Sequence, residues 1–301
     1  MVGAKLMYRK VLTGTDDDCD VRPVYAYISK HYGLNLPTDS LAPTDPNVPG
    51  GCFIFNPGSS VSLLFPADAS GKLYPVNLTA AQVGEPKYRR NYESVQLTAE
   101  KVFDHNWYLN LSYVWAKERG NTEGLVNSTN GQSDTGTSYL FDYPELMQGS
   151  NGLLPNDHRH TFKAYGAWRA TPQWLFGVNA YIQSGRPENC LGLNPIDNTL
   201  NGGYGNTYFY CDGMVMAQGS AGTTPWIWNL DMNVEYDPSW AKGLKIRANI
   251  YNIFNKQRYT TINETGEDAN GASLAGTTYK VPTSFQTPRY IQLQAEYDFS
   301  L

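Results

Sequence analysis

The chain has 301 residues, a formal net charge of −5 and only 17% charged residues. This weakly acidic balance gives no electrostatic footprint for nucleic acid, and 22 tyrosines with 11 phenylalanines argue against a disordered chain. No run of about 18 apolar residues is present, so no transmembrane helix is predicted. The composition does not change along the chain, which favours a single β domain.

Eight segments of roughly ten residues alternate apolar and polar side chains, the period-two pattern of a strand with two unlike faces. In chain order they are Val2–Leu12, Tyr92–Lys101, Trp107–Lys117, His160–Arg169, Trp174–Ser184, Trp226–Tyr236, Leu244–Phe254 and Arg289–Leu301. A tilted strand of this length crosses a bilayer. The predicted fold is therefore all-β: an antiparallel up-and-down transmembrane β-barrel segment of about eight strands with long extracellular loops.

The links between these segments alternate strictly between short and long. The short links are Lys101–Asn106, Ala170–Gln173 and Asp237–Gly243, and the long ones span residues 13–91, 118–159, 185–225 and 255–288. Transmembrane barrels have short periplasmic turns and long external loops. We therefore expect the long links to be external loops without regular structure, and the C-terminus to be periplasmic.

The two faces of the predicted strands differ in chemistry. Aromatic residues fall near the strand ends on the apolar face, as expected at a membrane interface; they include Trp107, Trp174, Trp226, Tyr236 and Phe299. Charged residues fall on the polar face, which we expect to face the lumen: Lys163, Arg169, Asp231, Glu235, Lys245 and Arg247. In that position they would pair with one another, contact an inner domain or line a substrate path, and we favour the structural role.

Four cysteines lie in the predicted outer loops, Cys19 and Cys52 in the first, Cys190 and Cys211 in the third. An even number in an exported protein indicates disulfides. Three connectivities are open, and the loop-local one is the simplest.

Aromatic residues of the third and fourth long loops are candidates for ligand capture, because exposed loop aromatics commonly bind ligands. They are Tyr204, Tyr208, Phe209, Tyr210 and Tyr259. Packing of the loops against themselves is the equally weighted alternative.

Two further clusters resemble metal sites. His158 and His160 would share a strand face, but no third ligand is evident. The acidic run Asp16–Asp20 has oxygen ligands suited to calcium without EF-hand spacing. We expect the start of a strand at the first and a solvated loop at the second. No catalytic constellation or phosphate-binding loop is present, so we expect neither an enzyme nor a cofactor.

Several stretches of the chain resemble the C-terminal barrel of Oar-like TonB-dependent outer-membrane receptors, and they follow one another in the same order as in that family. They are Pro86–Ser128, Pro155–Pro187, Ile246–Tyr259 and the closing strand. The resemblance implies a receptor of the Gram-negative outer membrane, with a plug domain inside a 22-stranded barrel and energy from the TonB complex. Its motifs identify a scaffold and leave the extracellular ligand unknown.

This sequence lacks a recognisable plug or TonB-contact segment and has about a third of the strands. We therefore expect residues 1–301 to be the C-terminal part of such a barrel, forming an arc. The first ten residues lack the apolar core of a secretory signal, which favours the downstream part of a longer protein. Two alternatives stay open: a small self-contained outer-membrane porin or adhesin barrel, and a secreted β-sandwich that binds carbohydrate.

Overall fold

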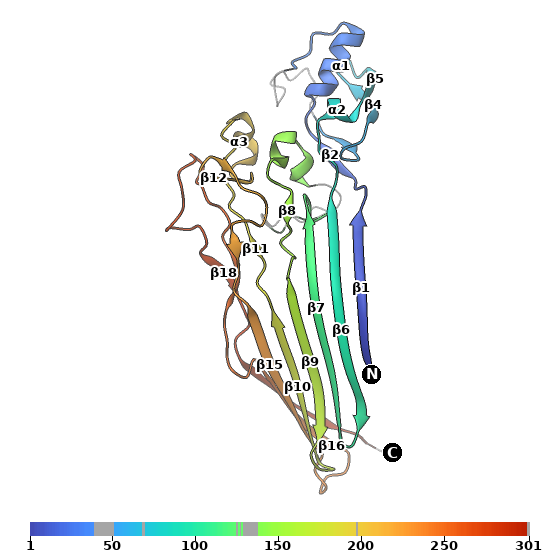
Figure 1. Ribbon diagram of the computed structural model, residues 1–301, viewed down its shortest axis with the longest axis vertical. Coiled ribbons are helices and arrows are strands. Elements are labelled where there is room, and N and C mark those ends of the chain that lie inside the picture. The colour runs from blue at the N-terminus through green and yellow to red at the C-terminus, as the bar shows by residue number, and fades with distance from the viewer. Residues whose placement is uncertain are drawn as a thin grey trace.

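The computed structural model describes residues 1–38, 51–67, 70–124, 126, 128, 138–196 and 198–299. It consists of a tall antiparallel sheet with a layer of structured loops at one end of the strands (Figure 1). Among the described residues, no helix is both long and apolar enough to cross a membrane.

The sheet is a meander in which each long strand pairs with the next along the chain. All eight predicted strands are confirmed. In order they are β1 Val2–Val11, β6 Arg90–Asp104, β7 Trp107–Gly120, β9 His160–Arg169, β10 Trp174–Gln183, β15 Ile227–Tyr236, β16 Leu244–Tyr251 and β19 Tyr290–Tyr297. The short β8, Gly152–Leu153, extends the sheet beside the end of β7.

This sheet does not close on itself. Among the described strands, β1 pairs only with β6 and β19 only with β16, so both edges are open. A self-contained barrel would need β1 and β19 to pair. The structure therefore has the expected arc in place of a small closed barrel.

The register gives each strand two chemically distinct faces, because side chains directly opposite each other in a ladder point the same way. One cross-strand row is apolar: Leu111, Ala164, Ala180 and Leu230. The adjacent row, one residue along each strand, is polar: Ser112, Lys163, Tyr181 and Asn229.

Within the part of the chain that the structure describes, no second layer covers the apolar face of the final strand. Ile291 is 62% exposed, Leu293 75% and Tyr297 50%. A β-sandwich would bury these side chains against a second sheet. The sandwich alternative is therefore wrong for the described part of the chain.

The short links lie at the end of the sheet opposite the loop layer. His105 and Asn106, between β6 and β7, have φ angles of 50° and 67°. Two successive left-handed residues make a type I′ turn, whose twist matches that of the flanking strands. The other two short links join β9 to β10 and β15 to β16, as predicted.

The long links are not structureless, contrary to our expectation. The first contains β2 Asp16–Asp18, α1 Arg22–Tyr32, β3 Phe53–Phe55, β4 Val61–Pro66, β5 Leu73–Leu78 and α2 Ala80–Val83. The second has two 3-10 turns, η1 Tyr139–Phe141 and η2 Pro144–Met147. The third has β11 Pro187–Glu188, α3 Asn198–Tyr204, β12 Tyr210–Cys211, β13 Met214–Val215 and β14 Gly222–Thr223, and the fourth β17 Tyr259–Ile262 and β18 Pro282–Phe285.

The hydrophobic core of the molecule lies within this loop layer. Tyr25 and Ile28 of α1, Phe141 of η1 and Tyr208 of the third loop are all fully buried in one cluster. Three loops far apart in the sequence thus exclude water together. This burial explains why the links fold.

We expect Phe141→Ala to destabilise the loop layer by about 3–5 kcal/mol, because Phe141 is fully buried and stacks on Tyr88. Hydrogen exchange of the loop segments would rise, while exchange in β9 and β10 would stay slow. Phe254→Ala, at a side chain 63% exposed, is the matched control. Unchanged loop protection in Phe141→Ala would contradict the shared core.

Candidate functional site

The six predicted lumen residues lie on a single face of the sheet. They occupy odd-numbered positions of β9, β15 and β16, and the register places them in cross-strand rows. Glu235, for example, lies directly opposite Arg247, and Tyr181 lies between Lys163 and Asn229.

Three of these side chains, Asp231, Glu235 and Arg247, bind side chains of neighbouring strands. The Arg247 guanidinium donates to Glu235 at 2.6 Å and to Glu296 at 2.8 Å, which joins three strands. Asp231 accepts from Asn179 at 3.2 Å and from Asn229 at 2.7 Å.

The remaining three are less engaged. Lys163 lies over the ring of Tyr181, Arg169 donates to the carbonyl of Pro172 in the short turn, and Lys245 is exposed opposite Glu296. These contacts favour a structural role for the six residues, in which they hold the strands of the sheet together.

Three of the loop aromatics follow the equally weighted alternative, in which the loops pack against themselves. Tyr208, Phe209 and Tyr210 are at most 2% exposed, because they pack in the core shared by the loops. Tyr204 is half-buried and donates to Asp142 at 2.7 Å. Tyr259 is also half-buried and lies opposite Phe285 in the β17–β18 hairpin.

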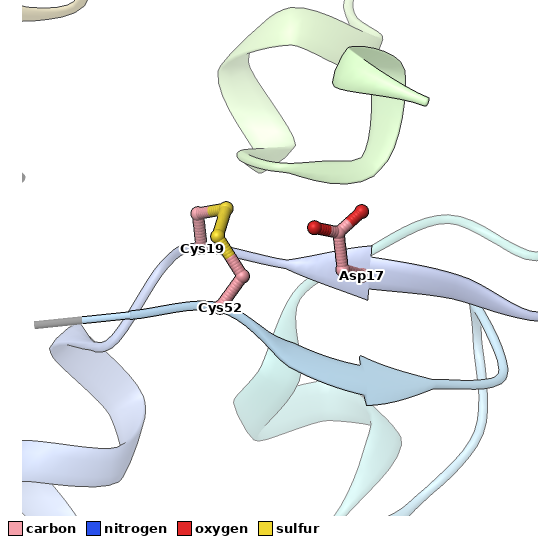
Figure 2. A group of neighbouring side chains, drawn as sticks. All are labelled: Asp17, Cys19 and Cys52. Carbon is pink, nitrogen blue, oxygen red and sulfur yellow. A yellow bond between two sulfur atoms is a disulfide. The ribbon is translucent and has the colours of Figure 1, made fainter. Parts of the chain in front are cut away.

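The cysteines form the two loop-local disulfides, Cys19–Cys52 and Cys190–Cys211. Cys19, Cys52 and the Asp17 carboxylate form the only group of three metal-ligand side chains within the described residues. Figure 2 shows the two sulfur atoms bonded to each other, with Asp17 on the neighbouring strand β2. Metal binding requires thiolates, so this group does not make a metal site.

The histidine pair is engaged within the protein. Nδ1 of His158 lies 2.8 Å from the carbonyl oxygen of Ser184, and Nδ1 of His160 lies 2.8 Å from the hydroxyl of Tyr113. The His160 ring also stacks on Trp226. Both residues have the role expected at the start of a strand.

The acidic run is buried, where we expected a solvated loop. Asp16, Asp18 and Asp20 are at most 3% exposed. Their alternating positions place them on one side of an extended segment, a signal in the sequence that could have predicted shared burial. Asp16 accepts from the backbone and hydroxyl of Ser138, and Asp20 pairs with Arg22 at 2.7 Å.

Sequence reasoning missed two further acids of this cluster, Glu85 and Asp142. Both carboxylate oxygens of Glu85 are buried without a hydrogen-bond partner among the described residues, and Asp142 accepts from Tyr204. Burial is the largest cause of their pKa shifts: it raises the pKa of Asp142 to about 7, that of Asp18 to about 8 and that of Glu85 to about 10. The loop layer therefore folds with part of its acid cluster protonated.

The stability of the loop layer should fall as pH rises from about 4 to 8. The folded state binds these protons more tightly than the unfolded chain does. The stabilisation that the bound protons give the folded loop layer is therefore complete below the ordinary carboxyl pKa. It is lost as the pH rises through the pKa of the folded state. Asp142→Asn removes one such ionisation and still accepts from Tyr204. At pH 8 we expect roughly tenfold slower hydrogen exchange in η1 and α3 of this variant than in the wild type.

At pH 4 the two proteins should exchange alike. Asp212→Asn, at an exposed acid, should retain the wild-type pH dependence. The burial argument fails if Asp142→Asn and the wild type lose protection equally between pH 4 and 8.

Residues 42–177 match the family model described as an outer membrane beta barrel domain. The chain is 26% identical over 308 aligned residues to the TonB-dependent transporter Oar of Myxococcus xanthus, covering 89% of this chain and 26% of that protein. The chain thus spans about a quarter of the length of the curated relative it matches.

Two solved structures match part of the chain. The transporter YddB of Escherichia coli matches with a TM-score of 0.43 and 11% identity, over 82% of this chain and 29% of that one. The ferric-catecholate import receptor Fiu of E. coli matches with a TM-score of 0.41 and 14% identity, over 81% of this chain and 24% of that one.

The described part of the chain is an all-β antiparallel sheet, and residues 42–177 are similar to an outer membrane beta barrel domain. The predicted resemblance to an Oar-like TonB-dependent transporter is confirmed.

Proposed function

We propose that this chain forms part of the wall of a TonB-dependent outer-membrane receptor and takes part in ligand capture and uptake. The observation that carries the proposal is a sheet with one continuous apolar face and one polar face, whose final strand is left uncovered by the described residues. Lipid on one side and a wet lumen on the other would satisfy both faces.

The height of the apolar face supports a bilayer. Trp107 and Trp115 of β7 share this face and are eight residues apart, about 26 Å along a strand at ~3.3 Å per residue. The outward apolar band of such barrels is about 25 Å tall. Aromatic side chains mark both ends of the band: Trp107, Trp168, Trp174 and Tyr236 at one, and Trp115, Trp226 and Trp228 at the other.

The lengths of the links support the orientation that we propose. Short turns at one end and a structured loop layer at the other match periplasmic and extracellular ends. In β19, Tyr297 lies opposite Leu244, the first residue of β16, which follows a short link. The chain would therefore end on the periplasmic side.

The polar face would line the lumen, with Lys163, Arg169, Asp231, Glu235, Lys245 and Arg247 directed inward. Lipid supplies no hydrogen-bond partners for the open edges of β1 and β19. We therefore propose that residues 1–301 form the C-terminal part of a larger barrel, which surrounds a plug domain and receives energy from the TonB complex. No enzymatic step is part of this role.

Ligand capture would fall to the loop layer. Tyr204 and Tyr259 keep part of their surface accessible and are our candidates for contact with an extracellular ligand. The buried trio Tyr208, Phe209 and Tyr210 would fix the shape of that surface from below.

A charge on the two faces should have unequal effects. Leu230→Arg places a cation in the apolar row and should destabilise the membrane-inserted sheet by roughly 2–4 kcal/mol near the midplane. Asn229→Arg, one residue away in the polar row, is the matched control and should be far milder. Urea unfolding of the complete barrel in phospholipid vesicles measures both variants, and equal tolerance would refute the facing assignment.

A further inference from the structure

Three side chains that can bind a metal share one face of the small β2–β3 ladder in the first loop. The register pairs Asp17 with Ile54, and two residues further along it places Cys19 opposite Cys52. Side chains two residues apart on a strand point the same way, and so do side chains directly opposite each other. Figure 2 shows the Asp17 carboxylate and the two sulfur atoms on the same side of the strand pair.

This face of the ladder is the accessible one. Cys52 is exposed, and Asp17 and Cys19 are half-buried. Asp16 and Asp18, on the opposite face, are at most 2% exposed and belong to the buried acid cluster. A small reductant or an ion in solution can therefore reach the three side chains without entering the core of the loop layer.

The Asp17 carboxylate has an oxygen free to bind a cation. Its Oδ1 atom is buried and has no hydrogen-bond partner among the described residues. A buried acceptor without a partner destabilises the fold, and a bound cation would remove that penalty. One ligand atom each from Asp17, Cys19 and Cys52 lies within 4.8 Å of both of the others. The three side chains are thus gathered closely enough to share one ion.

The closed disulfide keeps this set from binding a metal, because each sulfur is bonded to the other and metals are bound by thiolates. A small thiol reductant would change this. Two thiol molecules are oxidised to a disulfide of their own, and their two electrons and two protons break the Cys19–Cys52 bond and leave two cysteine thiols. A divalent cation that binds both sulfurs then displaces the two thiol protons.

Two thiolates and one carboxylate define the class of metal. Thiolate ligands select zinc, whereas calcium and magnesium prefer oxygen ligands alone. Zinc takes four ligands in a tetrahedral arrangement, and a site with three protein ligands completes it with water. The face of the ladder supplies those three.

We propose that reduction of the Cys19–Cys52 disulfide converts this face of the β2–β3 ladder into a zinc site whose protein ligands are Cys19, Cys52 and Asp17. In the oxidised chain the disulfide joins the two strands. In the reduced chain the metal would join the same strands, so that the first loop stays closed in either redox state when zinc is present. This role is separate from the proposed membrane function and does not depend on it.

The second disulfide is the internal comparison. Cys190 is 1% exposed, so a reductant reaches the Cys190–Cys211 bond less readily. Among the described residues, no third metal-ligand side chain lies as close to this sulfur pair as Asp17 does to the first. Reduction of the second disulfide should therefore create no comparable zinc site.

The test uses the full chain, oxidised or reduced with dithiothreitol that is then removed by gel filtration under argon. Zn²⁺ affinity is measured by competition with a chromophoric chelator, and Co²⁺ is used as a second probe because its thiolate charge-transfer absorption reports sulfur ligands. We expect the reduced wild type and the reduced Cys190→Ser/Cys211→Ser variant to bind one Zn²⁺ per chain and to show this absorption. The oxidised wild type and the reduced Cys19→Ser/Cys52→Ser variant should show neither.

The carboxylate ligand is tested by Asp17→Asn, with Asp298→Asn as the matched control at an exposed acid. Loss of a direct ligand should weaken binding at least as much as loss of an outer-shell partner does. We therefore expect reduced Asp17→Asn to bind Zn²⁺ roughly tenfold to a hundredfold more weakly than the reduced wild type. Reduced Asp298→Asn should bind as the wild type does.

Three results would overturn the proposal. The first is a reduced wild type that binds Zn²⁺ no better than the oxidised chain, and the second is equal Zn²⁺ affinity in Asp17→Asn and Asp298→Asn. The third concerns a reduced chain whose ladder has opened, which hydrogen exchange in β2 and β3 detects. Zn²⁺ should restore slow exchange there, because metal binding is coupled to folding of the site, and binding without that restoration would contradict a metal that joins the two strands.

Discussion

The structure depends on one constraint: a strand that pairs on both sides must present alternate side chains to two different surroundings. Strand pairing is continuous from β1 to β19. The direction in which side chains point from one strand therefore fixes their direction in all the others. The apolar row through Leu230 and the polar row through Asn229 both result from the same register. The aromatic boundaries and the ion pairs of Arg247 both follow from this alternation.

The sheet could be predicted from the sequence because its signal is local. His160–Arg169 alternates residue by residue, and the structure gives a strand with the same bounds. Tyr92–Lys101 alternates less regularly, and the strand there is longer at both ends, because pairing with two neighbours extends it beyond its own pattern. The lengths of the links indicated which ends of the strands lie together.

The loop layer could not be predicted, because its order comes from contacts between distant segments. Tyr208, Phe209 and Tyr210 are three aromatics in a row, and no period indicates which of them is covered. Phe141 and Tyr25, from two other loops, belong to the same core cluster and help to bury them. Glu85 gave no signal, because its burial beside Asp18 and Asp142 arises from tertiary packing. The alternation of Asp16, Asp18 and Asp20 did carry information, but a solvated loop was the simpler reading.

The positions of the two disulfides make each of them independent of the sheet. Each joins cysteines of one link, 33 and 21 residues apart, and neither crosses between links or spans a strand of the sheet. The two cysteines of a pair can therefore meet without any pairing between the long strands. Each bond shortens the chain that its own link must order and places no covalent restraint on how the long strands pair.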